Sequence, residues 1–108
     1  MKTTIMIATM AGGAEVEAKI VTPGLAVHQE RGNEISPTWA ITHIGSGLQV
    51  ATGAKTEAGA LSAALAMGKL TDWTMTDDAL IAHMKGRRRE VIEILESRGM
   101  RLSTERPS

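Results

Sequence analysis

The stretch from Trp39 to Met67 constrains the fold more than any other part of the chain. Residues 39–44 (WAITHI) alternate as in a β-strand, the glycines of residues 45–47 (GSG) can adopt positive φ, and residues 48–52 (LQVAT) resume the alternation. Thr56 can then act as the N-cap of a helix through residues 58–67, with Glu57 near the positive end of its dipole. The pattern predicts a β-hairpin followed by a helix.

The length of the hairpin turn decides which side chains share a face of the sheet. A four-residue turn would place Trp39 and Ile41 on the same face as Leu48 and Val50. A three-residue turn would reverse that pairing, because side chains in a strand alternate with a period of two. The core that we expect consists of Trp39, Ile41, Leu48, Val50, Leu61, Leu65 and Leu80.

Further strands are predicted before the hairpin. We interpret the apolar, Thr-interrupted run of residues 1–10 as an edge strand in preference to a signal peptide. Residues 14–21 alternate between apolar and charged side chains, and Pro23-Gly24 predicts a turn after them. Residues 25–30 form another short strand, which a polar loop separates from Trp39.

A second helical pattern follows the first helix. Thr76-Asp77-Asp78 supplies an N-cap and acidic first-turn residues, and apolar residues continue at helical spacing from Leu80 to Leu95. Gly86 lies in the middle of this pattern and either kinks the helix or splits it in two. Gly99 suits the C′ position, and residues 103–108 are expected to be a flexible tail.

Length and pattern together favour one α+β domain over residues 1–102. We expect an antiparallel sheet of three to five strands followed by two helices, the first of them packed on one face of the sheet. Twelve basic and twelve acidic residues cancel, so the chain has no strong net field toward nucleic acid or membranes. The absence of cysteine excludes disulfides and fits a cytoplasmic location. No stretch is long enough to span a membrane.

Few residues are candidates for chemistry. His28 and His43 fall on neighbouring predicted strands, but two histidines are too few for a closed zinc site, and we expect each to hydrogen-bond to the sheet or to a loop carbonyl. His83 is interpreted in the same way. Ser46 lacks the five-residue elbow motif of a serine nucleophile, and no Lys follows Gly47 as in a phosphate-binding loop. We therefore expect no catalytic residue, no metal, no cofactor and no enzymatic activity.

The segment from Lys85 to Arg89 (KGRRR) is the one concentrated charge, and it has two interpretations. It can contact a phosphate backbone or an acidic protein, or it can be a solvated helix face on which Arg89 pairs with Glu93. The apolar stripe through Met84, Val91 and Leu95 predicts that Arg88 falls at the edge of the buried side. Arg87 and Arg89 are then expected to project outward. The candidate partner-binding residues are therefore Lys85, Arg87 and Arg89.

The segment WAITHIGSGLQV, preceded by LAVH and followed by a TEA helix, resembles sequences found in short accessory proteins of bacteriophages, plasmids and integrative elements. This resemblance covers roughly residues 25–73 and carries over no catalytic position. Proteins of this setting, anti-CRISPR proteins among them, often bind and block host machinery or regulate the element's own genes. The strand-then-helix layout is also similar to small antitoxin-like domains.

Two functional hypotheses follow. The first is a non-enzymatic interaction protein that binds and blocks a host defence complex, either a protein or a ribonucleoprotein. The second is a nucleic-acid-binding or antitoxin-like regulator that uses the Lys85 to Arg89 segment. Having only Trp39 and Trp73 as aromatic residues argues against binding of single strands by stacking. Homodimer formation is left open by the sequence.

Overall fold

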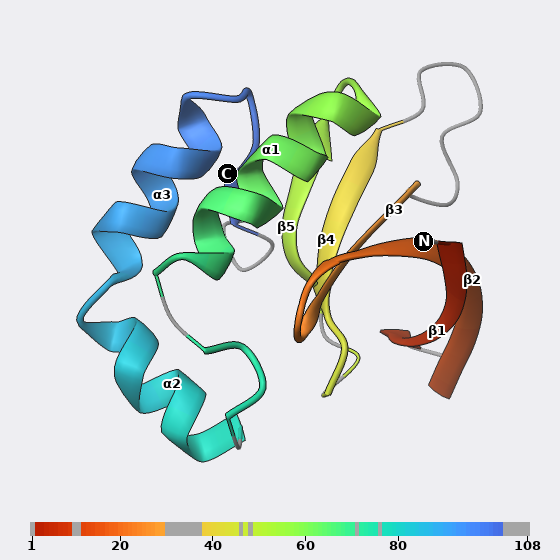
Figure 1. Ribbon diagram of the computed structural model, residues 1–108, viewed down its shortest axis with the longest axis horizontal. Helices are drawn as coiled ribbons and strands as arrows, with labels where there is room; N and C mark the ends of the chain where they lie inside the picture. Colours follow the sequence, from red (N-terminus) through yellow and green to blue (C-terminus); the bar gives the residue numbers. More distant parts are fainter. Residues whose placement is uncertain are drawn as a thin grey trace.

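The computed structural model describes residues 2–9, 12–29, 38–45, 47, 49–70, 72–75 and 77–102. Within these residues, six strands form a single antiparallel sheet in sequence order, and three helices accompany it (Figure 1). The strands are β1 (Lys2–Thr9), β2 (Gly12–Thr22), β3 (Leu25–Gln29), β4 (Trp39–His43), β5 (Gln49–Ala54) and β6 (Arg101–Leu102). The helices are α1 (Glu57–Gly68), α2 (Asp77–Lys85) and α3 (Arg88–Glu96).

The α+β class and the antiparallel sheet are confirmed, but two details of the prediction are corrected. The sheet has six strands, because the chain returns after the last helix and adds β6 to β5. Three helices are present where two were expected, because the second helical pattern is split at Gly86. The predicted strand at the start of the chain is present as β1, which pairs along its length with β2. The proposed C-terminal tail lies outside the described residues.

The β4–β5 hairpin keeps the predicted orientation with a shifted register. Thr42 pairs with Gln49, as a four-residue turn requires, but bulges then shift the pairing so that Ile41 faces Ala51 and Trp39 faces Ala54. Gly53, with φ +91°, lies between the two shifted pairs, where a bulge needs a residue that tolerates positive φ. Ile41 is fully buried, whereas Trp39 and Val50 are partly buried against the same core. Leu48 lies outside the described residues.

Helix α1 begins where the sequence predicts and packs on the sheet through small side chains. Thr56 is its N-cap, and its side chain accepts a hydrogen bond from the Gly59 amide at 3.1 Å. At the other end α1 lies so close to β2 that a Cβ on Gly68 would approach Thr22 to 2.8 Å. The face toward the sheet consists of Ala60, Ala63, Ala64 and Met67.

The prediction that Leu65 belongs to the core is wrong. Its side chain is 52% exposed, whereas Leu61 is partly buried at the flank of α1 and Leu80, on α2, is buried as predicted. Because successive helical residues are about 100° apart, Leu65 lies roughly opposite the alanine face that approaches the sheet. The close approach of helix to sheet favours small residues inside and places this leucine outside.

The link from α1 to α2 is tied to the turn between β2 and β3. Trp73 is buried, and its indole N–H donates to the Met67 carbonyl at 2.9 Å. Its own carbonyl accepts a hydrogen bond from His43 Nε2 at 2.8 Å. A Cβ on Gly24, whose φ is +93°, would lie 2.5 Å from that same carbonyl oxygen. These contacts of Trp73 hold α1 and α2 on the end of the sheet.

Helix α3 ends as the sequence predicts. The Met100 amide donates to the Leu95 carbonyl at 2.8 Å and the Gly99 amide to the Glu96 carbonyl at 3.1 Å. With φ +73° at Gly99, these bonds form a Schellman motif in which Gly99 is the C′ residue. Leu95 and Met100 are both buried in the core, as the hydrophobic contact of that motif requires.

Candidate functional site

The predicted partner-binding residues lie at the corner between α2 and α3, where they differ in exposure. Lys85, Arg88 and Arg89 are exposed, and the described part of the chain offers none of them a hydrogen-bonded or ionic partner. Arg87 is half-buried at the N-cap of α3. The segment therefore presents three solvated cations, which include Lys85 and Arg89 of the predicted set.

The predicted orientations of Arg87 and Arg88 differ from those in the structure. Arg87 donates from Nε to His83 Nε2 at 2.9 Å and forms an ion pair with Glu90 at 3.3 Å, so its side chain has partners in the protein although it is 40% exposed. Arg88 is exposed, although it was expected at the edge of the buried side. The prediction assumed one continuous helix, but the break at Gly86 resets the phase. Arg87 is the N-cap of α3 and lies one turn before the buried Val91, so it is less exposed than Arg88 and Arg89.

The two sheet histidines do not form a pair. His43 faces Leu25 on the α1 side of the sheet, whereas His28 faces Ala40 on the opposite side. His28 donates from Nδ1 to the Gln29 carbonyl at 3.1 Å, and its Nε2 lies 2.7 Å from the Thr42 hydroxyl. Each ring is therefore engaged with the sheet or a loop carbonyl, as expected. Ser46 lies outside the described residues, and the Gly47 amide already donates to the His43 carbonyl at 2.9 Å.

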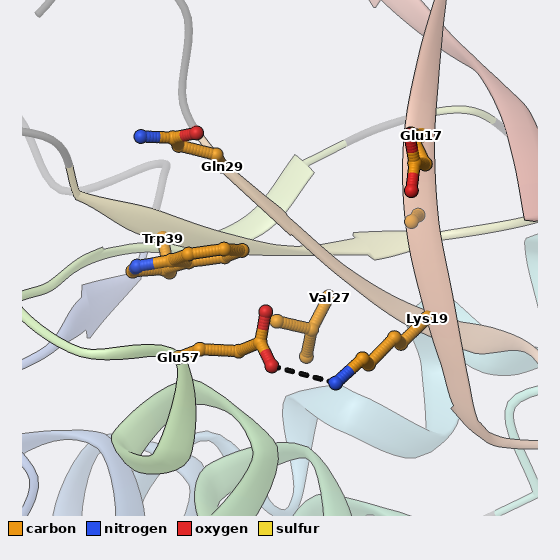
Figure 2. Close-up of a pocket in the computed structure, with 7 residues that line it drawn as sticks. Glu17, Lys19, Val27, Gln29, Trp39 and Glu57 are labelled. Carbon is orange, nitrogen blue, oxygen red and sulfur yellow. Dashed lines mark hydrogen bonds and ion pairs between the residues drawn. The ribbon is translucent and has the colours of Figure 1, made fainter. Parts of the chain in front are cut away.

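A pocket of about 230 Å³ lies between the middle of β2 and the N-terminus of α1 (Figure 2). Lys19 Nζ and Glu57 Oε1 form an ion pair at 2.7 Å inside it, and both side chains are about one-third exposed. In the view of Figure 2, the Trp39 ring lies above Glu57. The Gln29 side chain points away from the ion pair. The described residues that line the pocket are Glu17, Ala18, Lys19, Val27, Gln29, Trp39 and Glu57.

The ion pair in this pocket links two elements of the structure. Lys19 and Glu57 neutralise one another, and they connect β2 to the first turn of α1, where a carboxylate is also stabilised by the helix dipole. The described lining includes no hydroxyl, thiol or imidazole that could serve as a nucleophile or a general base. The titratable side chains in that lining are Glu17, Lys19 and Glu57, of which Lys19 and Glu57 are engaged in the ion pair.

The outer face of α1 carries a feature that the sequence prediction missed. An open groove of about 540 Å³ runs along the helix on the side away from the sheet, and Arg98, two residues after the end of α3, forms one wall of it. Its floor is largely apolar and includes the exposed Leu65. We call this surface the α1 groove. Its described lining is Ala58, Leu61, Ser62, Leu65, Ala66, Lys69 and Arg98.

A signal for this groove was present in the sequence. Residues 58–67 are apolar nearly all round the helix, which is typical of a helix buried on every side. In the structure only one face of α1 is covered by the sheet, so the other apolar face remains open among the described residues. The sequence places Leu65 in the core, but in the structure it lies on this open face.

Metal ligation and membrane insertion are two further kinds of function to consider for the described residues. No group of three or more His, Asp or Glu side chains in them is arranged to hold a metal ion. None of the described helices combines the length and the apolarity that a membrane span requires.

The comparisons with known proteins place the chain beside no established group. No family model, no curated protein and no solved structure matches it.

Proposed function

We propose that this protein is a non-enzymatic interaction protein that binds another protein through the α1 groove. The observation that carries the proposal is the open apolar face of α1, where Leu65 is 52% exposed although it belongs to an alanine- and leucine-rich helix. Exposed apolar surface bordered by polar residues is typical of protein interaction sites. Lys69 and Arg98 supply that border in the α1 groove.

We further propose that the partner belongs to a host complex in the cytoplasm and that binding blocks its action, as anti-CRISPR proteins do. Support for this part comes from the resemblance of residues 25–73 to accessory proteins of phages and mobile elements. Blocking by a bound surface needs no catalytic group, which agrees with the paired and hydrogen-bonded state of Lys19, Glu57 and His28.

Replacing Leu65 by serine is expected to weaken partner binding at least tenfold and to leave the melting temperature nearly unchanged. An apolar anchor at the centre of an interface commonly contributes more than 1 kcal/mol, whereas exposed substitutions usually change stability by about 0.5 kcal/mol or less. The measurement is capture from a bacterial lysate on the immobilised protein, followed by titration with the purified captured protein.

The matched control is Ile20→Ser. Ile20 is similarly exposed, at 46%, but it lies on β2 beside Lys19 and therefore points to the sheet face away from α1. The control variant should capture the same partner as the parent. Equal binding by the Leu65 and parent proteins would show that the interface lies elsewhere.

A second candidate function is nucleic-acid binding by the α2–α3 corner, favoured by the three unpartnered cations Lys85, Arg88 and Arg89. If all three contact phosphates, the slope of log affinity against log salt for duplex DNA should be about −2.7. Their replacement by alanine should flatten that slope, whereas Arg101→Ala, on β6, should not. A mobility shift that stays undetectable at low salt in the parent protein would remove this candidate.

A further inference from the structure

Arg98 forms one wall of the α1 groove and is held there by neutral acceptors. Its Nε donates to the Ser62 hydroxyl at 2.9 Å, and its Nη1 donates to the Ile94 carbonyl at 2.9 Å and to the Ser97 hydroxyl at 2.8 Å. None of these acceptors is a carboxylate, so within the described chain the positive charge of Arg98 is not compensated. The guanidinium is nevertheless fixed between α3 and α1.

Fixing a long side chain before binding removes a cost that association otherwise includes. Immobilising a rotamer-rich side chain at an interface costs roughly 0.5–1.5 kcal/mol, and the contacts with Ser62, Ile94 and Ser97 have already met that cost in the folded domain. The Nη2 group of Arg98 takes part in none of these three hydrogen bonds, so its two N–H donors can bind a carboxylate. Arg98 is therefore prepared for an anionic group that this domain does not supply.

The rest of the groove agrees with an acidic occupant. Lys69 is exposed at the C-terminal end of α1, and no described residue forms an ion pair with it. The described lining contains these two cations and no carboxylate, over a floor that includes Leu61 and Leu65. Cations along an apolar strip on a helix complement a second helix with apolar residues on one face and acidic residues beside them.

We propose that the partner of the α1 groove is an acidic amphipathic helix of another protein, with one carboxylate bound to Arg98. This inference rests on the proposed function and names the class of partner. The apolar face of the partner helix would cover Leu61 and Leu65, and a second carboxylate would lie near Lys69. A second copy of this chain is a poor occupant, because two grooves docked face to face would bring four cations together without a carboxylate from either lining.

The test uses two synthetic helical peptides that differ at one type of position. Both are about 18 residues long, with leucines at i, i+4, i+7 and i+11. One carries glutamate beside the leucine stripe and the other carries glutamine there. Binding is followed by chemical-shift titration of the isotope-labelled protein at low salt, and the affected amides show where the peptides lie.

The glutamate peptide should bind at least tenfold more tightly than the glutamine peptide and should shift amides of α1 and of the C-terminal end of α3. The variant Arg98→Ala should remove most of that preference, and the double-mutant cycle of Arg98→Ala with the peptide exchange isolates the pairwise term. Lys69→Ala, at an exposed position that does not bridge two helices, tests the same charge effect without risk to the fold and should reduce the preference by a smaller factor.

Equal affinity for the two peptides, or an unchanged preference in both the Arg98 and Lys69 variants, would overturn this inference. The proposed function would still stand if Leu65→Ser lost the captured partner, because that result depends on the apolar floor alone. Conversely, self-association in the parent protein that Leu65→Ser abolishes would identify a second copy as the occupant and would overturn the acidic-helix proposal.

Discussion

Replacing Trp73 by alanine is expected to lower the free energy of unfolding by about 4 kcal/mol, near the upper end for a single core substitution. Trp73 is 4% exposed, donates its indole N–H to the Met67 carbonyl, and lies against the His43 ring with centroids 6.4 Å apart. The substitution leaves a cavity at the end of α1 and removes one hydrogen bond of the Met67 carbonyl, which still accepts from the Leu70 amide at 3.0 Å.

Chemical denaturation followed by circular dichroism measures this loss without depending on tryptophan fluorescence. Trp39→Ala is the matched control, because Trp39 is half-buried at the start of β4 and should cost roughly half as much. If the two variants lose the same stability, the link between α1 and α2 is not part of the cooperative core.

Gly24→Ala is expected to destabilise the protein by about 4 kcal/mol, through two causes that add. The residue has φ +93°, which disfavours any side chain, and the new Cβ would lie 2.5 Å from the Trp73 carbonyl oxygen and 2.6 Å from its carbon. The clash involves backbone on both sides, so it can be relieved only by moving the turn away from the link. That movement would also stretch the His43 hydrogen bond to the same oxygen.

Gly99→Ala separates the two causes. Gly99 has a similar φ of +73°, but nothing lies within 4 Å of the Cβ that would be added. Its substitution should cost about 1 kcal/mol, the conformational part alone. The stabilities of the two variants are compared by their denaturation midpoints, with the dependence of the unfolding free energy on denaturant equal in both. A Gly24 variant no less stable than the Gly99 variant would show that the β2–β3 turn does not pack on Trp73 as described.

Local features of the sequence were sufficient to predict several elements and their ends. Thr56 caps α1 through a bond to an amide three residues away, and Gly99 ends α3 with positive φ. The alternation of residues 14–21 and 39–44 identified β2 and β4, and Gly86 marked a point where the second helical pattern was open to division. Each of these features depends on the dihedral preference or hydrogen bonding of residues within one turn.

The candidate site was predicted less well than the fold. The exposed charges of Lys85 and Arg89 were anticipated, but Arg87 is engaged by His83 and Glu90 because the helix phase restarts after Gly86. The α1 groove was missed, although the apolar character of residues 58–67 on all sides was visible in the sequence. Periodicity reveals that a helix has more apolar surface than one contact can cover, but it does not tell which side meets the sheet.

The sequence by itself determined the α+β class, the antiparallel sheet with most of its strands, the start of α1 and the end of α3. Only the tertiary structure decided the register of β4 against β5, the return of the chain as β6, and the exposure of Leu65 in place of an alanine. The physical reason for this difference is how far apart in the sequence the interacting residues lie. A cap or a turn is decided by neighbours within a few residues, whereas the depth at which α1 approaches β2 depends on Gly68 meeting Thr22, which lies 46 positions earlier (68 − 22). Arg98 donates a hydrogen bond to Ser62, which lies 36 positions earlier in the chain. The Arg98 guanidinium is therefore positioned at the α1 groove only once α1 and α3 have packed together.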